Sequence, residues 1–219
     1  MRMGCGVAVL GALAASACDA EQNRTGTVRD RNESIVSSAT PSSNKPTPSA
    51  TAAAAKKAPR ALCTQKPRGR TPDTRIETAA APSAYPPPNP IPFGAGKWIW
   101  VNLWAAWCGP CKEEMPRLLK WQTELRNSGV LLDFAFVSMD DDERQMRRFL
   151  ASQPEGGVRA TYWLKEESRQ KWLGAFGISE SATLPVHALV SPKGEVACII
   201  DGALDEEDFA RISAVLKGG

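Results

Sequence analysis

An apolar, aromatic segment that leads directly into two closely spaced cysteines is the feature that most restricts the fold of this chain. Residues 97–104, KWIWVNLW, carry apolar side chains on both faces, as a buried central strand requires. Cys108 and Cys111 follow in WCGPC, and residues 112–129 then place apolar side chains at helical spacing up to Gly129. Because α/β sheets place their chemistry where a strand ends and a helix begins, the cysteine pair is the predicted functional site.

The segments after this helix alternate between strand-like and helix-like patterns. A strand–helix–strand unit requires parallel pairing with a crossover, whereas the last two strand-like runs surround Pro-Lys-Gly, which predicts an antiparallel hairpin. The sequence therefore predicts an α/β fold with a central mixed sheet flanked by helices. The predicted elements are a strand at 130–140, a helix at 141–153, a short strand or extended loop at 158–164, a helix at 165–177, a hairpin at 184–201 and a helix at 205–219.

The composition changes sharply near residue 95. Residues 19–95 are rich in Pro, Ala, Ser and Thr and contain no tryptophan, whereas all 7 tryptophans lie between Trp98 and Trp172. A segment of this composition cannot bury enough apolar surface to offset the entropy of ordering its backbone. We therefore predict a disordered linker over 19–95 and one globular domain over 96–219.

The charge is divided between the same two parts. Residues 96–219 carry 15 Lys and Arg against 18 Asp and Glu, a net charge of −3, so the total of +3 leaves +6 for the first 95 residues. The basic residues of the linker lack the interleaved aromatic side chains of a nucleic-acid surface, so nucleic acid is not a predicted partner. No apolar stripe for oligomerisation is visible, which favours a monomer.

The first residues have the pattern of an export signal. Arg2 precedes an apolar run, ending at Ala17, that is too short to span a bilayer. The next residue, Cys18 in ASAC, resembles the site at which bacterial lipoproteins are cleaved and lipidated; secretion with cleavage after Ala17 is the alternative. We therefore expect residues 1–17 to be removed and Cys18 to anchor the chain to a membrane of the bacterial cell envelope, on the periplasmic side, with the linker as tether.

Two further cysteines remain after the signal, the lipid site and the WCGPC pair are set aside. They are Cys63, in the predicted linker, and Cys198, in a predicted strand. In an exported, oxidising compartment we favour a structural disulfide between them, with a second redox pair and two unpaired thiols as alternatives. The sequence does not decide, because a disulfide needs Cα atoms within about 7 Å.

Thiol–disulfide exchange explains the residue types around the WCGPC pair. A cysteine at a helix N-terminus faces unpaired N–H groups and the positive end of the helix dipole, so the pKa of the Cys108 thiol should fall below the free value of about 8.5. Cys111, one turn later and shielded, would attack the mixed disulfide as the resolving thiol. Supporting roles are expected for Gly109 and Pro110, which keep the turn compact, and for Trp104 and Trp107, which would form an apolar rim for a partner.

Metal binding is the alternative use of the cysteine pair. A zinc site needs four ligands, usually as two close pairs, and the other candidates, Cys63, Cys198 and the single His187, are far apart in the sequence. A copper site with His187 is also disfavoured. His187 lies in the alternating run 184–190, where a histidine is more typically a strand residue than a metal ligand. A purely structural C-x-x-C disulfide would be strained and reducible, which itself indicates redox use. We predict no metal and no cofactor beyond the disulfide itself.

Two motifs of this chain resemble the thioredoxin superfamily: VNLWAAWCGPCKEEMP at 101–116 and TLPVHALVSPKGEV at 183–196. They are most similar to the exported, membrane-anchored thiol–disulfide oxidoreductases of the TlpA/ResA type. The resemblance covers about residues 96–219 and implies the thioredoxin fold. It also implies that Pro185 is cis and packs beside the two cysteines, where it excludes metal, and that the Leu184 backbone pairs with an extended substrate.

The chain departs from cytosolic thioredoxins at Asn102. Those proteins carry a buried aspartate there, which accepts the proton of the resolving cysteine. Because asparagine cannot accept it, Cys111 must lose its proton to water or to another carboxylate. Glu114 is the candidate, with a simple helix-dipole partner as the alternative role. The second cysteine pair has no place in the family pattern.

The resemblance implies an enzyme that exchanges disulfides with protein cysteines outside the cytoplasm, with Cys108 as nucleophile and Cys111 as resolving thiol. The expected direction is the reduction of substrate disulfides, as in cytochrome c maturation, with electrons from a membrane thiol-reductant. One alternative is an oxidase or isomerase that donates disulfides. The other is a non-enzymatic thioredoxin-fold module that binds a partner or carries a metal.

Overall fold

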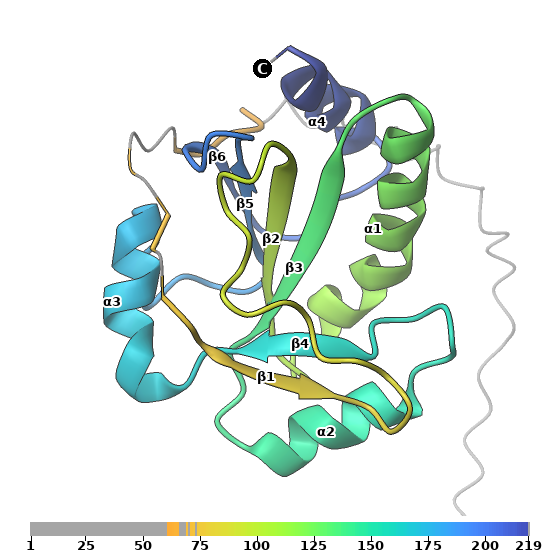
Figure 1. The fold of residues 1–219 in the computed structure, drawn as a ribbon, viewed down its shortest axis with the longest axis vertical. Coiled ribbons are helices and arrows are strands. Elements are labelled where there is room, and N and C mark those ends of the chain that lie inside the picture. Colours follow the sequence, from red (N-terminus) through yellow and green to blue (C-terminus); the bar gives the residue numbers. More distant parts are fainter. Residues whose placement is uncertain (1–60, 66–68, 70, 73, 219) are drawn as a thin grey trace, which may run out of the picture. The chain divides into compact units, whose positions relative to one another are not determined.

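A computed structural model describes residues 61–65, 69, 71–72 and 74–218 (Figure 1). The signal peptide, Cys18 and most of the linker predicted from the sequence lie outside this range. Within it, the strands are β1 Glu77–Ala80, β2 Trp98–Trp104, β3 Leu132–Ser138, β4 Ala160–Trp163, β5 Val186–Val190 and β6 Val196–Asp201. The helices are α1 Gly109–Asn127, α2 Glu143–Ser152, α3 Glu166–Phe176 and α4 Asp208–Lys217.

The described strands form one sheet in the order β1-β4-β3-β2-β5-β6. Strand β2 pairs in parallel with β3, which pairs in parallel with β4, and helices α1 and α2 supply the crossovers. The β5–β6 hairpin continues the sheet antiparallel from β2, and β1 adds an antiparallel edge beside β4. The prediction of an α/β fold with a mixed central sheet is therefore confirmed.

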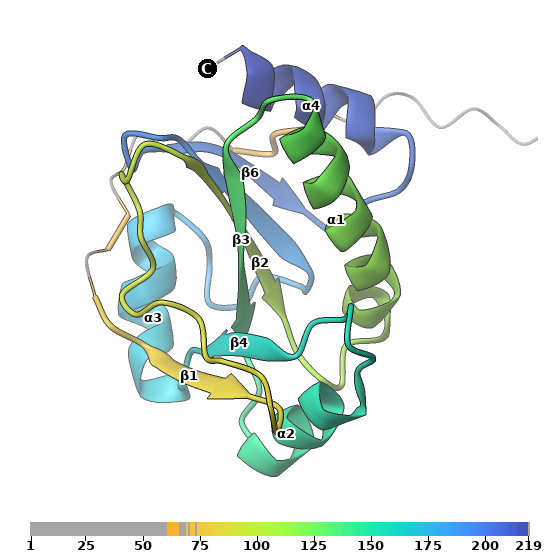
Figure 2. The same cartoon turned by 45° about the vertical axis from the view of Figure 1, so that its right-hand side comes forward.

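Strand β2 is buried on both faces of the sheet, as its sequence predicts. Because side chains alternate along a strand, one face receives Trp98, Trp100 and Trp104, and the other receives Ile99, Val101 and Leu103. The tryptophan face packs against apolar residues of α1, α2 and α4, and the aliphatic face packs against α3 (Figures 1 and 2). The strand is thus fixed between two layers, and so is the loop that follows it.

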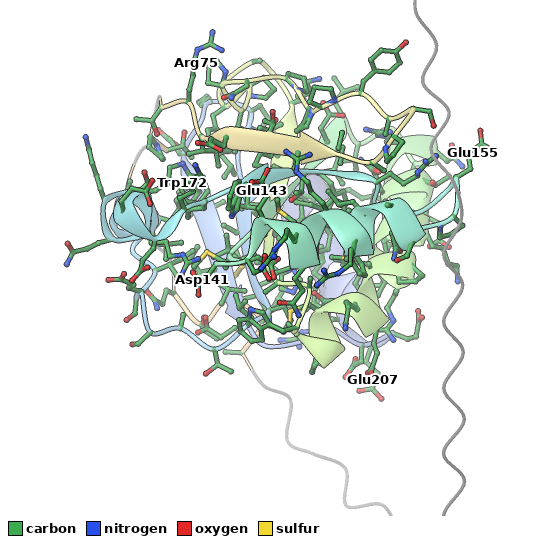
Figure 3. The ribbon with its side chains drawn as sticks, turned by 90° about the horizontal axis from the view of Figure 1, so that it is seen from below. Arg75, Asp141, Glu143, Glu155, Trp172 and Glu207 are labelled. Atoms are coloured by element: carbon green, nitrogen blue, oxygen red, sulfur yellow. A yellow bond between two sulfur atoms is a disulfide. The ribbon has the colours of Figure 1, made fainter. Side chains whose placement is uncertain are left out.

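Most charged side chains lie on the surface of the domain, and most large apolar side chains lie in its interior. Glu155 and Glu207 lie at the rim of the molecule in Figure 3, and Asp141 is also exposed, whereas Trp172 of α3 is buried. None of the helices in the described part of the chain is long and apolar enough to cross a bilayer.

The structure corrects the predicted domain boundary at residue 96. Strand β1 lies within the segment predicted as linker, and it pairs with β4 from Glu77 opposite Trp163 to Ala80 opposite Ala160. Its small side chains carry little apolar area, so their hydrophobic pattern is weak. The strand forms because the edge of β4 offers partners for its backbone N–H and C=O groups.

Residues 81–95 are also part of the domain rather than of a linker. The Tyr162 hydroxyl donates a hydrogen bond to the carbonyl oxygen of Pro88 at 2.6 Å. Burial, with a contribution from the negative charge of Asp133, raises the pKa of Tyr162 to about 12, so this phenol keeps its proton and remains a donor. The ring of Phe93 meets that of Phe176 edge to face, with centroids 5.9 Å apart.

Candidate active site

The WCGPC cysteines lie at the first turn of α1, immediately after the end of β2. Cys108 is the N-cap residue of the helix, with extended backbone angles (φ −79°, ψ 105°), and its sulfur accepts a hydrogen bond from the Cys111 N–H at 3.2 Å. Pro110 occupies the first turn, where a missing N–H costs nothing. Cys108 and Cys111 form a disulfide with Cα atoms 5.4 Å apart. The pair is therefore held where helix N–H groups can stabilise a thiolate once the bond is reduced.

The two cysteines are shielded, and one aromatic side chain beside them is not. Cys108 is 4% exposed and Cys111 is completely buried, whereas Trp107 is 58% exposed. Trp104 does not form the predicted apolar rim, because it is completely buried and its Nε1 donates to Thr161 Oγ1 at 3.1 Å. The prediction failed since Trp104 still belongs to β2 and points into the core, whereas Trp107 follows the strand.

A cis peptide bond joins Leu184 and Pro185 immediately before β5. Because Val186 pairs with Leu103 in antiparallel register, Pro185 comes to the level of Trp104, the last residue of β2. Leu184 is half-buried and packs against the apolar cluster that contains both WCGPC cysteines. The cis-proline and the cysteine pair thus lie at the same end of neighbouring strands.

A buried polar network lies on the tryptophan face of β2, below α1. Asn102 is directly opposite His187 of β5 in the antiparallel register. Asn102 Nδ2 donates to Glu114 Oε1 at 3.0 Å, and Trp100 Nε1 donates to His187 Nδ1 at 3.2 Å. His187 Nε2 lies 3.4 Å from Glu114 Oε1. All four side chains are at most 1% exposed.

Glu114 is part of the interior rather than a surface partner of the helix dipole. The first turn of α1 contains no acidic residue. Glu114 follows Cys111 by three positions on the same buried face of the helix. Its second oxygen, Oε2, accepts a hydrogen bond from the Leu204 N–H at 3.0 Å. The carboxylate is therefore placed one helical turn from the resolving cysteine.

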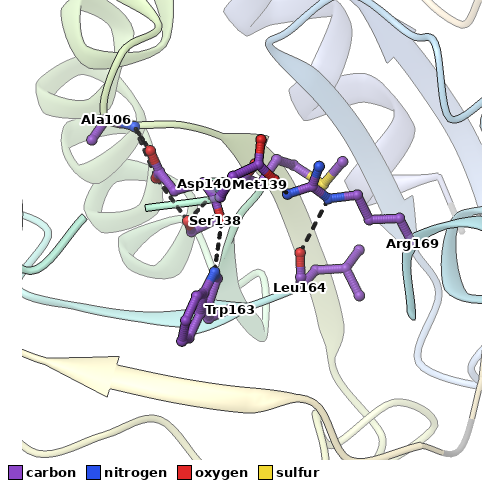
Figure 4. A network of polar contacts seen from close by, with 8 residues as sticks. Ala106, Ser138, Met139, Asp140, Trp163, Leu164 and Arg169 are labelled. Carbon is purple, nitrogen blue, oxygen red and sulfur yellow. Dashed lines mark hydrogen bonds and ion pairs between the residues drawn. The ribbon is translucent and has the colours of Figure 1, made fainter. Parts of the chain in front are cut away.

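Asp140 is a second buried carboxylate, and sequence reasoning missed it. Both of its side-chain oxygens accept from the Ala106 N–H, at 3.0 and 2.9 Å, and Oδ2 also accepts from the Ser138 hydroxyl at 2.8 Å (Figure 4). Burial raises the pKa of Asp140 above its ordinary value, although the Ala106 and Ser138 hydrogen bonds oppose the shift. Asp140 thus fixes the loop two residues before Cys108. Its position just after β3, which is parallel to β2, is the signal that could have indicated it.

Cys63 and Cys198 form the second disulfide, with Cα atoms 5.1 Å apart. This is the pairing that the sequence analysis favoured. Cys63 is half-buried and Cys198, in β6, is completely buried. Across the part of the chain that the structure describes, no group of three or more His, Cys, Asp or Glu side chains could hold a metal ion.

Comparison with known families finds a match in the region that holds the candidate site. Residues 92–199, just under half of the chain, match the AhpC/TSA family. The matched region includes the cysteine pair, Glu114, Asp140 and the cis-proline Pro185.

Among curated proteins, the thiol-disulfide oxidoreductase ResA of Bacillus subtilis is 26% identical to this chain over 124 residues. The match covers 57% of this chain and 64% of that relative. ResA of Oceanobacillus iheyensis is 28% identical over 109 residues, covering 50% of this chain and 52% of the relative. The chain therefore matches less than two thirds of the length of either protein.

Solved structures share the fold of this domain. A Chlorobium tepidum protein described as thiol:disulfide interchange protein DsbE superposes with a TM-score of 0.53 at 17% identity, covering 70% of this chain and 98% of that one. A thioredoxin-related protein from Neisseria meningitidis serogroup B gives a TM-score of 0.50 at 24% identity, covering 65% and 100%. At these identities the likeness establishes the fold alone.

Proposed function

We propose that this chain is a thiol–disulfide oxidoreductase that acts on protein cysteines. The observation that carries the proposal is the Cys108–Cys111 disulfide at the N-terminus of α1, at the same end of the sheet as the cis-proline Pro185. The two ResA relatives are named as thiol-disulfide oxidoreductases.

The proposed reaction proceeds through a mixed disulfide. The Cys108 thiolate attacks one sulfur of a substrate disulfide, bonds to it and releases the first substrate thiolate. Cys111, after losing its proton, attacks the sulfur of Cys108, which forms the Cys108–Cys111 disulfide and releases the second substrate thiolate. Two electrons pass from the protein dithiol to the substrate, and a donor dithiol restores the pair by the reverse exchange. No cofactor takes part in these steps.

Glu114 is the proposed acceptor for the Cys111 proton. It lies one helical turn after Cys111 on the buried face of α1, and it accepts hydrogen bonds from Asn102 and from the Leu204 backbone. General bases of this kind contribute about 10²- to 10⁴-fold to the rate of a proton-transfer step. Asn102 cannot accept the proton through its amide, so it acts as a donor to the carboxylate.

The proposed docking site for the partner lies around the pair. Trp107 offers an exposed apolar ring next to Cys108, and Leu184 lies half-exposed before the cis-proline. No backbone hydrogen bond of Leu184 is found within the described residues, so its N–H and C=O are available to an extended peptide. An added strand of this kind combines main-chain pairing with contacts to alternate side chains.

We propose the reductive direction, with electrons from a membrane thiol-reductant and a role such as cytochrome c maturation. The test is the reduction potential of Cys108–Cys111, measured by equilibrating the protein with glutathione or dithiothreitol buffers. A reductant should give about −250 mV or lower, as thioredoxin does. A value near about −120 mV would instead make the chain a disulfide donor. Absence of a reversible dithiol–disulfide couple would refute the redox function altogether.

We also propose that the chain is exported and held to a membrane, on the periplasmic side, by a lipid on Cys18. The apolar run before Cys18 and the small residues around it support this location. In fractionated bacterial cells, the wild-type chain should sediment with membranes, and the Cys18→Ala variant should move to the soluble envelope fraction. Recovery of wild-type protein in the soluble fraction would favour secretion without lipid, and recovery in the cytoplasm would contradict export.

A further inference from the structure

The tautomer of the single histidine is fixed by its neighbours. Trp100 Nε1–H can only donate, and it lies 3.2 Å from His187 Nδ1. Asn102 Nδ2, which donates to Glu114 Oε1, lies 3.3 Å from the same ring nitrogen. Two donors directed at Nδ1 require that nitrogen to be unprotonated. The imidazole is therefore neutral, and its proton is on Nε2.

The protonated nitrogen faces the buried carboxylate. His187 Nε2 lies 3.4 Å from Glu114 Oε1, and among the described residues this buried nitrogen makes no hydrogen bond. Glu114 thus has N–H groups around it from three elements: Asn102 of β2, His187 of β5, and Leu204 of the loop before α4. An ionised carboxylate, which only accepts, matches this set of donors.

We propose that His187 is a positioning residue for thiol–disulfide exchange, which in its neutral Nε2–H form orients Glu114 to take the proton of Cys111. A second proton on the ring would place an N–H at Nδ1 against the donors of Trp100 and Asn102. His187 therefore cannot compete for the proton, which goes to Glu114 alone. This inference rests on the proposed function.

Two charged side chains, Arg117 and Glu206, lie next to this network at the loop that reaches Glu114. On α1, Arg117 donates to the carbonyl oxygen of Leu204 and pairs with Glu206 at 3.2 Å, so it holds the loop whose N–H reaches Glu114. In the same loop, the Asp205 N–H donates to Asp208 Oδ2 at 3.2 Å. The buried titratable groups in direct contact are His187 and Glu114 themselves.

The tautomer can be observed directly, because His187 is the only histidine of the chain. The imidazole nitrogens of the ¹⁵N-histidine-labelled full chain should show the Nε2–H tautomer. A proton on Nδ1 would overturn the assignment without bearing on whether the protein exchanges disulfides.

Kinetic variants test the effect on exchange. The resolving step should be about 10-fold slower in His187→Asn, whose amide can accept from Trp100 but is too short to reach Glu114. His187→Gln, which can return an N–H toward Glu114, should stay within about 3-fold of wild type.

These outcomes separate the inference from the proposed function. If His187→Asn keeps the wild-type rate while remaining folded, the positioning role is wrong although the enzyme is still an oxidoreductase. If both variants lose rate equally, so that His187→Gln does not restore exchange, His187 has only a structural role. If the wild-type protein itself shows no exchange, the proposed function fails first.

Discussion

A Cys108→Ser variant loses thiol–disulfide exchange by about 10³-fold or more, whereas Cys111→Ser accumulates a covalent mixed disulfide with its substrate. The two cysteines differ in position rather than in accessibility, since both are almost completely shielded in the disulfide. Cys108 is the N-cap residue, and its sulfur already accepts the Cys111 N–H. The N–H groups in the first turn of α1 stabilise a thiolate at this sulfur. Cys111 lies inside the helix, so its sulfur does not receive this stabilisation.

The measurement is the reduction of a model protein disulfide, followed by non-reducing electrophoresis and mass spectrometry of any adduct. A matched control is the double variant Cys63→Ala/Cys198→Ala, which removes the other disulfide and should leave exchange within about 3-fold of wild type. A covalent adduct in Cys108→Ser but not in Cys111→Ser would reverse the assignment of nucleophile and resolving thiol. No adduct in either variant would favour a binding module.

The parts of the site that the sequence predicts are those determined by local order along the chain. Strand β2, the cysteine pair and the start of α1 follow one another directly, so hydrophobic pattern and spacing are sufficient. The proline before β5 was predicted from family resemblance, and it lies at the level of Trp104 because β2 and β5 are paired. These features have one cause. The buried strand β2 fixes the segment that follows it in the chain and the strands that pair with it.

The parts that the sequence does not predict depend on pairing between distant segments. Nothing in the local pattern places His187 opposite Asn102, because only the antiparallel register of β2 and β5 does so. Asp140 resembles any acidic residue at a strand end until the parallel β2–β3 pairing brings it to Ala106. Strand β1 was missed for a related reason, since β4 rather than its own small side chains makes it a strand.

Loss of the Cys63–Cys198 disulfide should lower the stability of the domain. This disulfide closes a loop with a sequence separation of 135. Cross-links over loops of this size typically contribute about 2–5 kcal/mol, mainly by restricting the unfolded chain. The double variant Cys63→Ala/Cys198→Ala should therefore unfold about 3 kcal/mol more easily, which corresponds to a fall in Tm of roughly 6–12 °C. Calorimetry of the oxidised proteins measures the difference. The double variant avoids leaving an unpaired thiol, which a single substitution would create.

This disulfide also holds a segment against the edge of the sheet. The Thr64 N–H donates to the Ile199 carbonyl at 2.8 Å, and the Ile199 N–H donates to the Gln65 carbonyl at 3.1 Å. In the double variant these hydrogen bonds lose their covalent support, so the Ile199 amide proton should exchange with solvent faster than in wild type. Amides of β2 should change only as the global stability does. Equal Tm values for the wild type and the double variant, with unchanged exchange at Ile199, would mean that the hydrogen bonds alone hold this segment on β6.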